Sequence, residues 1–218
     1  MVALLEDFKR LLASEQKEEA VNYALSLLES GKVELVELYE NILTPALNQM
    51  ECKLEDRNLC IWKEHVQTAI VRTIVECCYP YVMKQRKQEG KNNGLTAVIL
   101  CPPEEYHDLG ARMVTDFFTL CGYHTIFVGS NTPYQDFYQA IYSIQPDLVA
   151  ISVSNYFNLV ATKRIIRELR EASLKTPLIV AGGRAIDRDE KSIEIIGADE
   201  RICSFHDIMQ LSERQVQS

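Results

Sequence analysis

Residues 101–110 hold the side chains best suited to chemistry in this chain. The segment is CPPEEYHDLG and places three carboxylates and one histidine ahead of a glycine. If it leaves a strand in an extended conformation, Glu105 and His107 point the same way, because side chains two residues apart share a face. The carboxylate can then accept the Nδ1 proton of the imidazole and leave Nε2 as an electron-pair donor. Such an imidazole suits a transition metal such as cobalt or iron, although a single histidine after a strand is more often structural.

Five other positions carry small or hydroxyl side chains that would suit a ligand. Gly110 would let a bulky group approach the backbone where a helix begins. Ser152 and Ser154 share a face of an extended segment, so their hydroxyls could bind a polar part of a ligand. Gly182 and Gly183 have no side chains. Their presence at the end of a predicted strand indicates either room for a ligand or an ordinary turn.

The elements that must position these residues follow residue 94, where short apolar runs alternate with amphipathic stretches. The predicted strands are 95–101, 124–129, 147–154, 177–183 and 200–204. Strands alternating with helices predict a parallel sheet covered on both faces. With right-handed crossovers this is a doubly wound, flavodoxin-like (Rossmann-like) five-stranded α/β fold. Such folds bind ligands beyond the carboxyl ends of their strands, where all the residues named above are expected.

Residues 1–88 follow a different pattern, with apolar residues recurring every three and four positions. This spacing predicts about four helices joined by short links, most simply a helical bundle. Pro45 should kink or break its helix. Residues 89–94 contain no apolar side chain and are the predicted linker to a second domain, 95–218.

The composition excludes several classes of function. The 218 residues carry a formal net charge of −8 and no dense basic cluster, which argues against direct nucleic-acid binding. No signal peptide and no membrane-spanning stretch is present. The seven scattered cysteines indicate reduced thiols in a cytoplasmic protein. We expect no catalytic residue and no enzyme in its own right, because no nucleophile–base pair lies near the predicted strand ends.

The loops argue against two common α/β sites and exclude a third. The first loop lacks the glycines of a dinucleotide fingerprint and the Gly-Lys-Ser/Thr of a phosphate loop. A phosphorylated receiver domain would need an aspartate at the end of the third strand, where Ser152-Val153-Ser154 stands instead.

The sequence resembles the cobalamin-binding domains. EYHDLG, residues 105–110, resembles their Asp-x-His-x-x-Gly signature, with Glu105 in the aspartate position. Ser152-Val153-Ser154 and the Gly182-Gly183 pair match two further elements. Residues 1–88 resemble the four-helix cap that precedes such domains in methionine synthase and related proteins, so the resemblance covers nearly the whole chain.

The resemblance implies a cofactor, adenosylcobalamin or methylcobalamin, with its own nucleotide base displaced from cobalt. His107 would be the lower axial ligand of the cobalt, and Glu105 would modulate the histidine as a ligand. The displaced tail would run past Gly110 and the Ser152, Ser154, Gly182 and Gly183 positions. Asp108 and Leu109 belong to the same predicted site, and the helical half would cover the upper face of the cofactor.

One segment of the cap resembles a narrower group. Residues 54–71, LEDRNLCIWKEHVQTAIV, are similar to part of the light-responsive cobalamin-dependent transcriptional repressors. Those carry a Trp, nine spacers and then Glu-His over the upper face. Glu64 and His65 match this pattern, whereas Leu54 stands at the Trp position and Trp62 lies at a different spacing. Glu64 and His65 could also be an ordinary helix surface.

Three functions are compatible with these features. The favoured hypothesis is a sensory module, responding to light or to the upper ligand of cobalt and signalling to a separate regulator. The alternative is a corrinoid methyl carrier working with separate methyltransferases. A mutase subunit is the third, and the cap argues against it. The expected partners are the corrinoid and one separate protein, either a regulator or a methyltransferase. The chain could also form a homo-oligomer. No membrane partner is expected.

Overall fold

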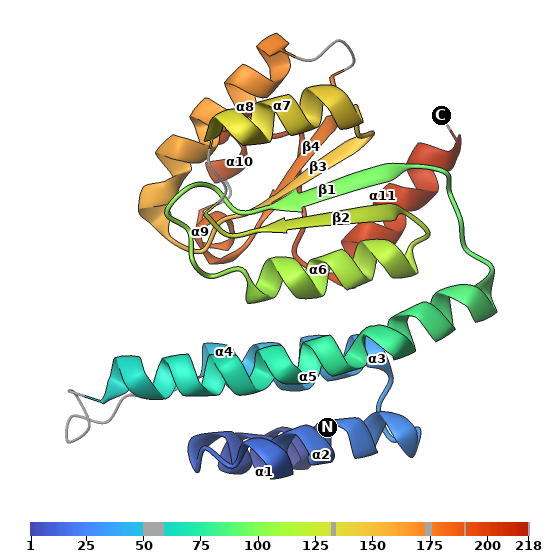
Figure 1. Cartoon of the computed structure of the whole chain (residues 1–218), viewed down its shortest axis with the longest axis vertical. Coiled ribbons are helices and arrows are strands. Elements are labelled where there is room, and N and C mark those ends of the chain that lie inside the picture. Colours follow the sequence, from blue (N-terminus) through green and yellow to red (C-terminus); the bar gives the residue numbers. More distant parts are fainter. Residues whose placement is uncertain (50–58, 132–133, 173–175, 190, 218) are drawn as a thin grey trace. The chain divides into compact units, whose positions relative to one another are not determined.

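The computed structural model describes residues 1–49, 59–131, 134–172, 176–189 and 191–217. These form two compact units, Met1–Lys84 and Gln85–Ser218. The first unit is helical and the second is built on a sheet (Figure 1). No helix in the described ranges is long and apolar enough to span a membrane.

The first unit contains the helical elements that the apolar spacing predicts. They are α1 (Val2–Ala13), α2 (Lys17–Glu29), the consecutive segments α3 (Leu35–Glu37), π-helix Leu38–Leu43 and α4 (Thr44–Asn48), and α5 (Cys60–Glu89). The long helix α5 continues beyond Lys84 into the second unit. The largest side chains buried in the first unit are Phe8, Leu12, Leu38, Tyr39, Ile42, Leu43, Ile70 and Ile74.

Pro45 shapes the third helical stretch. Proline has no amide hydrogen, and its ring crowds the carbonyl four residues earlier, so an α-helical hydrogen bond is lost there. The chain widens to a π-helix over Leu38–Leu43, and the Thr44 amide donates to the Tyr39 carbonyl. The expected kink or break is therefore a π-helical stretch through which the helix continues.

The second unit has a five-stranded parallel sheet in the order β2-β1-β3-β4-β5. The strands are β1 (Thr96–Leu100), β2 (His124–Gly129), β3 (Leu148–Ser152), β4 (Leu178–Gly182) and β5 (Glu200–Arg201). This order confirms the doubly wound α/β fold predicted from the sequence. The strand order reverses beside β1, which pairs with both β2 and β3, so a ligand crevice is expected at the carboxyl ends of β1 and β3.

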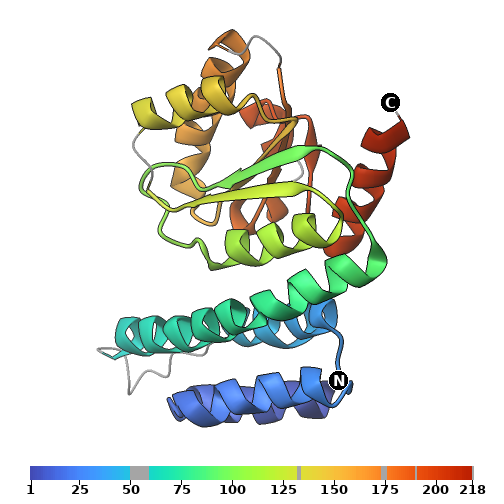
Figure 2. The same cartoon turned by 45° about the vertical axis from the view of Figure 1, so that its right-hand side comes forward.

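Helices cover both faces of this sheet. Helices α6 (Leu109–Leu120) and α11 (Phe205–Gln217) lie on one face, and α7 (Tyr134–Ile144) and α8 (Leu159–Ala172) lie on the other (Figures 1 and 2). Helix α10 (Ser192–Ile196) packs against α8. Two short elements were not predicted: the 3₁₀ turn Tyr156–Asn158 and helix α9 (Arg184–Asp187).

The cysteines differ in part from the expectation of reduced thiols. Cys60 is disulfide-bonded. The other described cysteines are free: Cys77, Cys78, Cys101, Cys121 and Cys203. Burial raises the pKa of Cys101 and that of Cys121 to about 12, so both thiols stay protonated at neutral pH.

Candidate functional site

The loop that joins β1 to α6 turns the Glu105 side chain into the protein. Glu104 adopts a left-handed conformation with φ 63°, and its amide donates to the Asn131 side-chain oxygen at 3.4 Å. The Glu105 amide then donates to the Pro102 carbonyl at 3.1 Å, which closes the turn. As a result the Glu105 side chain is fully buried, with 0% of its surface exposed.

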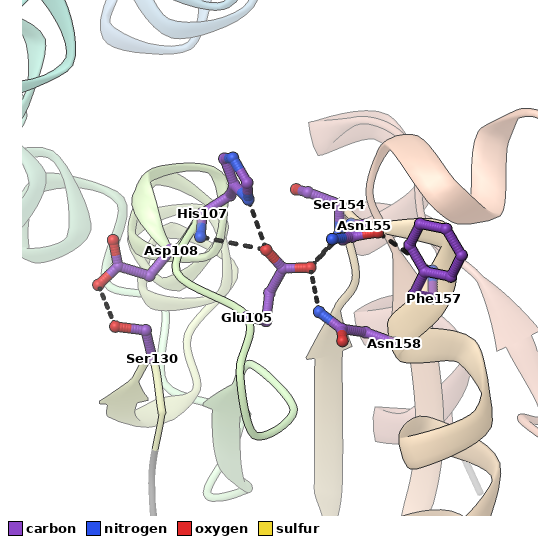
Figure 3. Close-up of polar contacts among 8 residues, drawn as sticks. All are labelled: Glu105, His107, Asp108, Ser130, Ser154, Asn155, Phe157 and Asn158. Carbon is purple, nitrogen blue, oxygen red and sulfur yellow. Dashed lines mark hydrogen bonds and ion pairs between the residues drawn. The ribbon is translucent and has the colours of Figure 1, made fainter. Parts of the chain in front are cut away.

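One oxygen of this carboxylate holds the histidine. Glu105 Oε1 lies 2.6 Å from His107 Nδ1 and accepts a 3.2 Å hydrogen bond from the His107 amide (Figure 3). The short contact places the proton on Nδ1 when the ring is neutral, because an ionised carboxylate can only accept. The electron pair of the imidazole is then on Nε2, as the spacing of the two residues predicts.

The other oxygen binds the turn that follows β3. Glu105 Oε2 accepts hydrogen bonds from the Ser154 amide at 3.0 Å, the Asn155 amide at 2.8 Å and Asn158 Nδ2 at 3.0 Å (Figure 3). The carboxylate thus connects the loops after β1 and β3, the two strands at which a ligand crevice is expected. It fixes His107 to the sheet through both loops.

These contacts decide the ionisation of Glu105. Burial acts to raise the pKa of the carboxyl group, but the hydrogen bonds from Asn155, His107 and Asn158 outweigh it and hold the pKa below its ordinary value. Glu105 is therefore ionised at neutral pH and remains an acceptor for the imidazole proton.

The environment of His107 fits a corrinoid. The side chain is 52% exposed, and Nε2 has no hydrogen-bond partner among the residues that the structure describes. A Cβ added at Gly110 would meet nothing within 4 Å, so the space at the start of α6 is open. No group of three metal-ligating side chains exists in the described part of the chain. The exposed ring, its outward Nε2 and the open space at Gly110 fit a bulky metal-bearing group such as a corrinoid.

Asp108 and Leu109 support the loop from the other side. Asp108 is 9% exposed, and its Oδ2 accepts a hydrogen bond from Ser130 Oγ at 3.4 Å. Figure 3 shows this pair extending away from the His107 ring. Leu109 is the buried first residue of α6. Both residues lie beside His107 in the chain. Asp108 connects the loop between β1 and α6 to Ser130, which directly follows β2, and Leu109 is buried where α6 begins.

The glycine pair at the end of β4 is explained by packing. A Cβ at Gly182 would lie 2.3 Å from the Ile202 carbonyl oxygen, and one at Gly183 would lie 2.7 Å from the Val153 carbonyl oxygen. Gly183 also has φ 101°, which disfavours any side chain. Neighbouring backbone thus occupies the positions that side chains would take, so packing alone accounts for both glycines. A contact of these glycines with the cofactor tail stays a prediction.

The remaining predicted residues fall into two groups. Ser152 and Ser154 are partly buried near the end of β3, where Ser152 pairs with Gly182. Glu64 and His65 are exposed on α5 in the first unit, and Leu54 lies outside the described residues. The structure therefore joins Glu105, His107 and Ser154 in one hydrogen-bond network. The cofactor contacts expected of Leu54, Glu64 and His65 remain predictions.

Sequence reasoning missed Asn155 and Asn158. Asn155 caps the 3₁₀ turn by accepting a hydrogen bond from the Phe157 amide at 3.1 Å, and Asn158 is buried against Glu105. An asparagine directly after a strand is a known turn former, and this signal was available in residues 152–158, SVSNYFN. The amide of Asn158 gave no local signal, because its partner is 53 residues away.

Known proteins resemble both halves of this chain. It is 25% identical over 196 residues to trimethylamine corrinoid protein 1 of Methanosarcina acetivorans, covering 89% of this chain and 85% of that protein. Its fold is similar to that of the Methanosarcina barkeri monomethylamine corrinoid protein, with a TM-score of 0.82 and 16% identity over 98% of each chain. A chain of the methanol:cobalamin methyltransferase complex MtaBC from Methanosarcina barkeri matches with a TM-score of 0.52 and 15% identity, over 99% of this chain and 80% of that one.

These relatives confirm the predicted cobalamin-binding resemblance, and they do not support the narrower resemblance to light-responsive repressors. None of the three just named is described as a sensor or a photoreceptor. The model of the B12 binding domain matches residues 95–204, which is half of the chain. The chain therefore belongs to the B12 binding domain family, whose cofactor is a corrinoid.

Proposed function

We propose that this protein is a corrinoid methyl carrier that receives a methyl group from one methyltransferase and delivers it to another. The observation that carries the proposal is the similarity to a trimethylamine corrinoid protein over 89% of the chain, which includes the helical half. This hypothesis was the alternative at the level of sequence. It now replaces the sensory module, which has no counterpart among the relatives named above.

The geometry of the site supports this role. A bound corrinoid supplies a cobalt ion that can take up and release a methyl group. His107 would bind the cobalt through Nε2, and Glu105 keeps the Nδ1 proton and the orientation of the ring. The Ser154 and Asn155 amides and Asn158 hold Glu105 in place. Gly110 leaves the approach to the loop open.

The chain is a carrier and not an enzyme in its own right. Its relatives are named as corrinoid proteins, and one similar chain comes from a complex with a methyltransferase. Methyl transfer to or from a substrate would then take place on separate proteins, which are the partners that we propose for this chain.

The first experiment tests cofactor binding. The purified protein is mixed in the dark with methylcobalamin and separately with hydroxocobalamin, desalted, and examined by absorbance spectroscopy. We expect the corrinoid to stay bound with the spectrum of a cobalt whose own base is replaced by histidine. His107→Ala should lose this spectrum, whereas His124→Ala, which alters an exposed histidine at the start of β2, should retain it.

A second experiment separates the carrier from the sensor. The reduced, corrinoid-loaded protein is incubated with candidate methyltransferases and a methyl donor, and methylation of the cobalt is followed by absorbance. Methylation at the same rate in darkness and light supports the carrier. A change of oligomeric state on illumination, without methylation by any methyltransferase, would return the sensory module to first place.

A further inference from the structure

We propose that one exposed face at the start of helix α8 docks an acidic surface of the methyltransferase that works with this chain. This inference rests on the proposed carrier function. We call this face the α8 stripe. It consists of Tyr156, Phe157, Val160, Lys163, Arg164 and Arg167.

The first part of the α8 stripe is apolar and unusually exposed. Phe157 is 85% exposed, Val160 is 78% exposed and Tyr156 is 56% exposed. Residues three and four apart lie on one side of a helix, so these side chains continue into the basic residues of the stripe. Exposed apolar patches rimmed by polar residues mark interaction sites, and aromatic residues contribute strongly to protein interfaces.

The second part of the α8 stripe is basic. Helix α8 carries four basic and two acidic residues, a net charge of +2 within a chain of net charge −8. Lys163 has no ion-pair partner among the described residues. Arg167 lies 3.9 Å from Glu168, which also pairs with Arg164 at 2.8 Å. A symmetric contact between two copies of the stripe would oppose like charges, so the charge favours an acidic partner of another kind.

A hollow continues the α8 stripe toward α7. It has a volume of about 520 Å³ and is lined by Tyr138, Arg167, Glu168 and Glu171. Tyr138 is fixed there, because its hydroxyl donates to the Ile165 carbonyl at 3.3 Å. The face therefore offers a projecting phenyl ring at one end and Arg167 beside a polar hollow at the other. An acidic partner would meet Arg167 at the rim of the hollow, since Glu168 and Glu171 make the hollow itself unfavourable for a carboxylate.

The α8 stripe begins at the turn that holds the candidate cofactor site. Asn155 accepts a hydrogen bond from the Phe157 amide, and the Asn155 amide and Asn158 donate to Glu105 Oε2. Figure 3 shows Phe157 and His107 on opposite sides of Glu105. A partner docked on the stripe would thus contact the same turn that positions the proposed axial histidine.

The test measures the rate of cobalt methylation against the concentration of the corrinoid-loaded full-length protein, with the methyltransferase that methylates the wild type. Phe157→Ala should raise the KM for the carrier about 10-fold with kcat unchanged. Val216→Ala alters an exposed apolar residue on α11, on the opposite face of the sheet, and should leave the KM unchanged.

A charge reversal tests the basic part of the α8 stripe. Lys163→Glu combined with Arg167→Glu should raise the KM about 10- to 100-fold at low salt, and the difference should shrink near 0.5 M salt because exposed charges are screened. The matched control, Lys84→Glu combined with Lys87→Glu, reverses two exposed basic residues on α5 and should behave as the wild type.

Each other outcome has a defined meaning. An unchanged KM in both stripe variants overturns the docking inference and leaves the carrier function standing. If Phe157→Ala retains less corrinoid than the wild type, the α8 stripe contacts the cofactor and the docking inference is overturned. If the wild type is a dimer and Phe157→Ala is a monomer, the stripe contacts a second copy of the chain, and the inference is again overturned. If the wild type binds corrinoid and no methyltransferase methylates it, the proposed function fails and the docking inference fails with it.

Discussion

The loop after β1 and the glycine pair at the end of β4 lie at the same edge of the sheet, yet the space beside them is used in opposite ways. In the loop, the buried Glu105 carboxylate binds protein donors with both oxygens and leaves His107 Nε2 outward. At Gly182 and Gly183, neighbouring carbonyl groups occupy the place where side chains would stand. A small residue at a strand end therefore indicates a ligand only where the space beside it is open, as it is at Gly110.

The largest effect on stability is expected at Gly183. In Gly183→Ala the new Cβ would lie 2.7 Å from the Val153 carbonyl oxygen at a φ of 101°. Strain and overpacking together should lower the free energy of unfolding by about 3 kcal/mol, measured by urea denaturation of the cofactor-free protein. A variant as stable as the wild type would show that the backbone can move and that packing does not explain this glycine.

The second-largest loss of stability is expected for Glu105→Gln. Glu105 Oε2 accepts three hydrogen bonds, and an amide in this position would either lose acceptors or turn an NH₂ group toward donors. We expect the free energy of unfolding to fall by about 2–3 kcal/mol, together with a weaker histidine-bound corrinoid spectrum. A stable variant with an unchanged spectrum would show that Glu105 neither holds the loops together nor orients His107.

Acidification tests the same carboxylate in the wild type. The folded-state pKa of Glu105 lies below its ordinary value of 4.5, so its contribution to stability is complete above that value and is lost as the pH falls through the folded-state pKa. The unfolding free energy of the wild type should therefore fall more steeply below pH 4.5 than that of Glu105→Gln. Parallel curves for the two proteins would contradict the lowered pKa.

A smaller effect is expected for Asn158→Ala. The change removes one of the donors to Glu105 Oε2 and leaves the two amides in place. We expect a loss of about 1–2 kcal/mol in the free energy of unfolding. Asn155→Ala should act differently, since its side chain caps the turn while its own amide still reaches Glu105. An equal loss of corrinoid ligation in both variants would assign the effect to the turn as a whole.

The smallest effect on stability is expected at Gly110, where a side chain would meet open space. Gly110→Leu should change the free energy of unfolding by less than about 0.5 kcal/mol. The same change should reduce corrinoid retention after desalting, because the leucine would fill the approach to the loop. Retention equal to that of the wild type would place the corrinoid elsewhere on the sheet edge.

The fold could be predicted because its signals are local and repeated. Apolar runs of strand length alternating with amphipathic stretches predict the parallel sheet, and the three-and-four spacing before residue 88 predicts the helical half. The 3₁₀ turn Tyr156–Asn158 and helix α9 were missed because neither is long enough to show a period. The π-helix before Pro45 was predicted only as a kink, since the sequence places the proline but not the form of the distortion.

The site was predictable where its partners are two residues apart, as for Glu105 and His107. It was not predictable where the partners depend on strand order. Asn158 meets Glu105 only because β1 and β3 are neighbours, and Gly182 is required only because the backbone after β5 passes close to it. The sensory hypothesis rested on Glu64-His65 in one helix and on residues 101–110, CPPEEYHDLG, with Glu105 in the aspartate position. Similarity over most of the chain outweighs two such short matches.

The hydrogen bonds of Glu105 also bear on the order of events during folding. Its partners after β3 are 49 to 53 residues away in the chain, so they form only after a large loop has closed, a slow step in folding. Until then the turn after β3 cannot hold the Glu105 carboxylate in place, nor the His107 ring through it. If His107 is the axial ligand that we propose, a partly folded chain would present it without its full support. The carboxylate would then favour cofactor loading by molecules in which β1 and β3 have already paired.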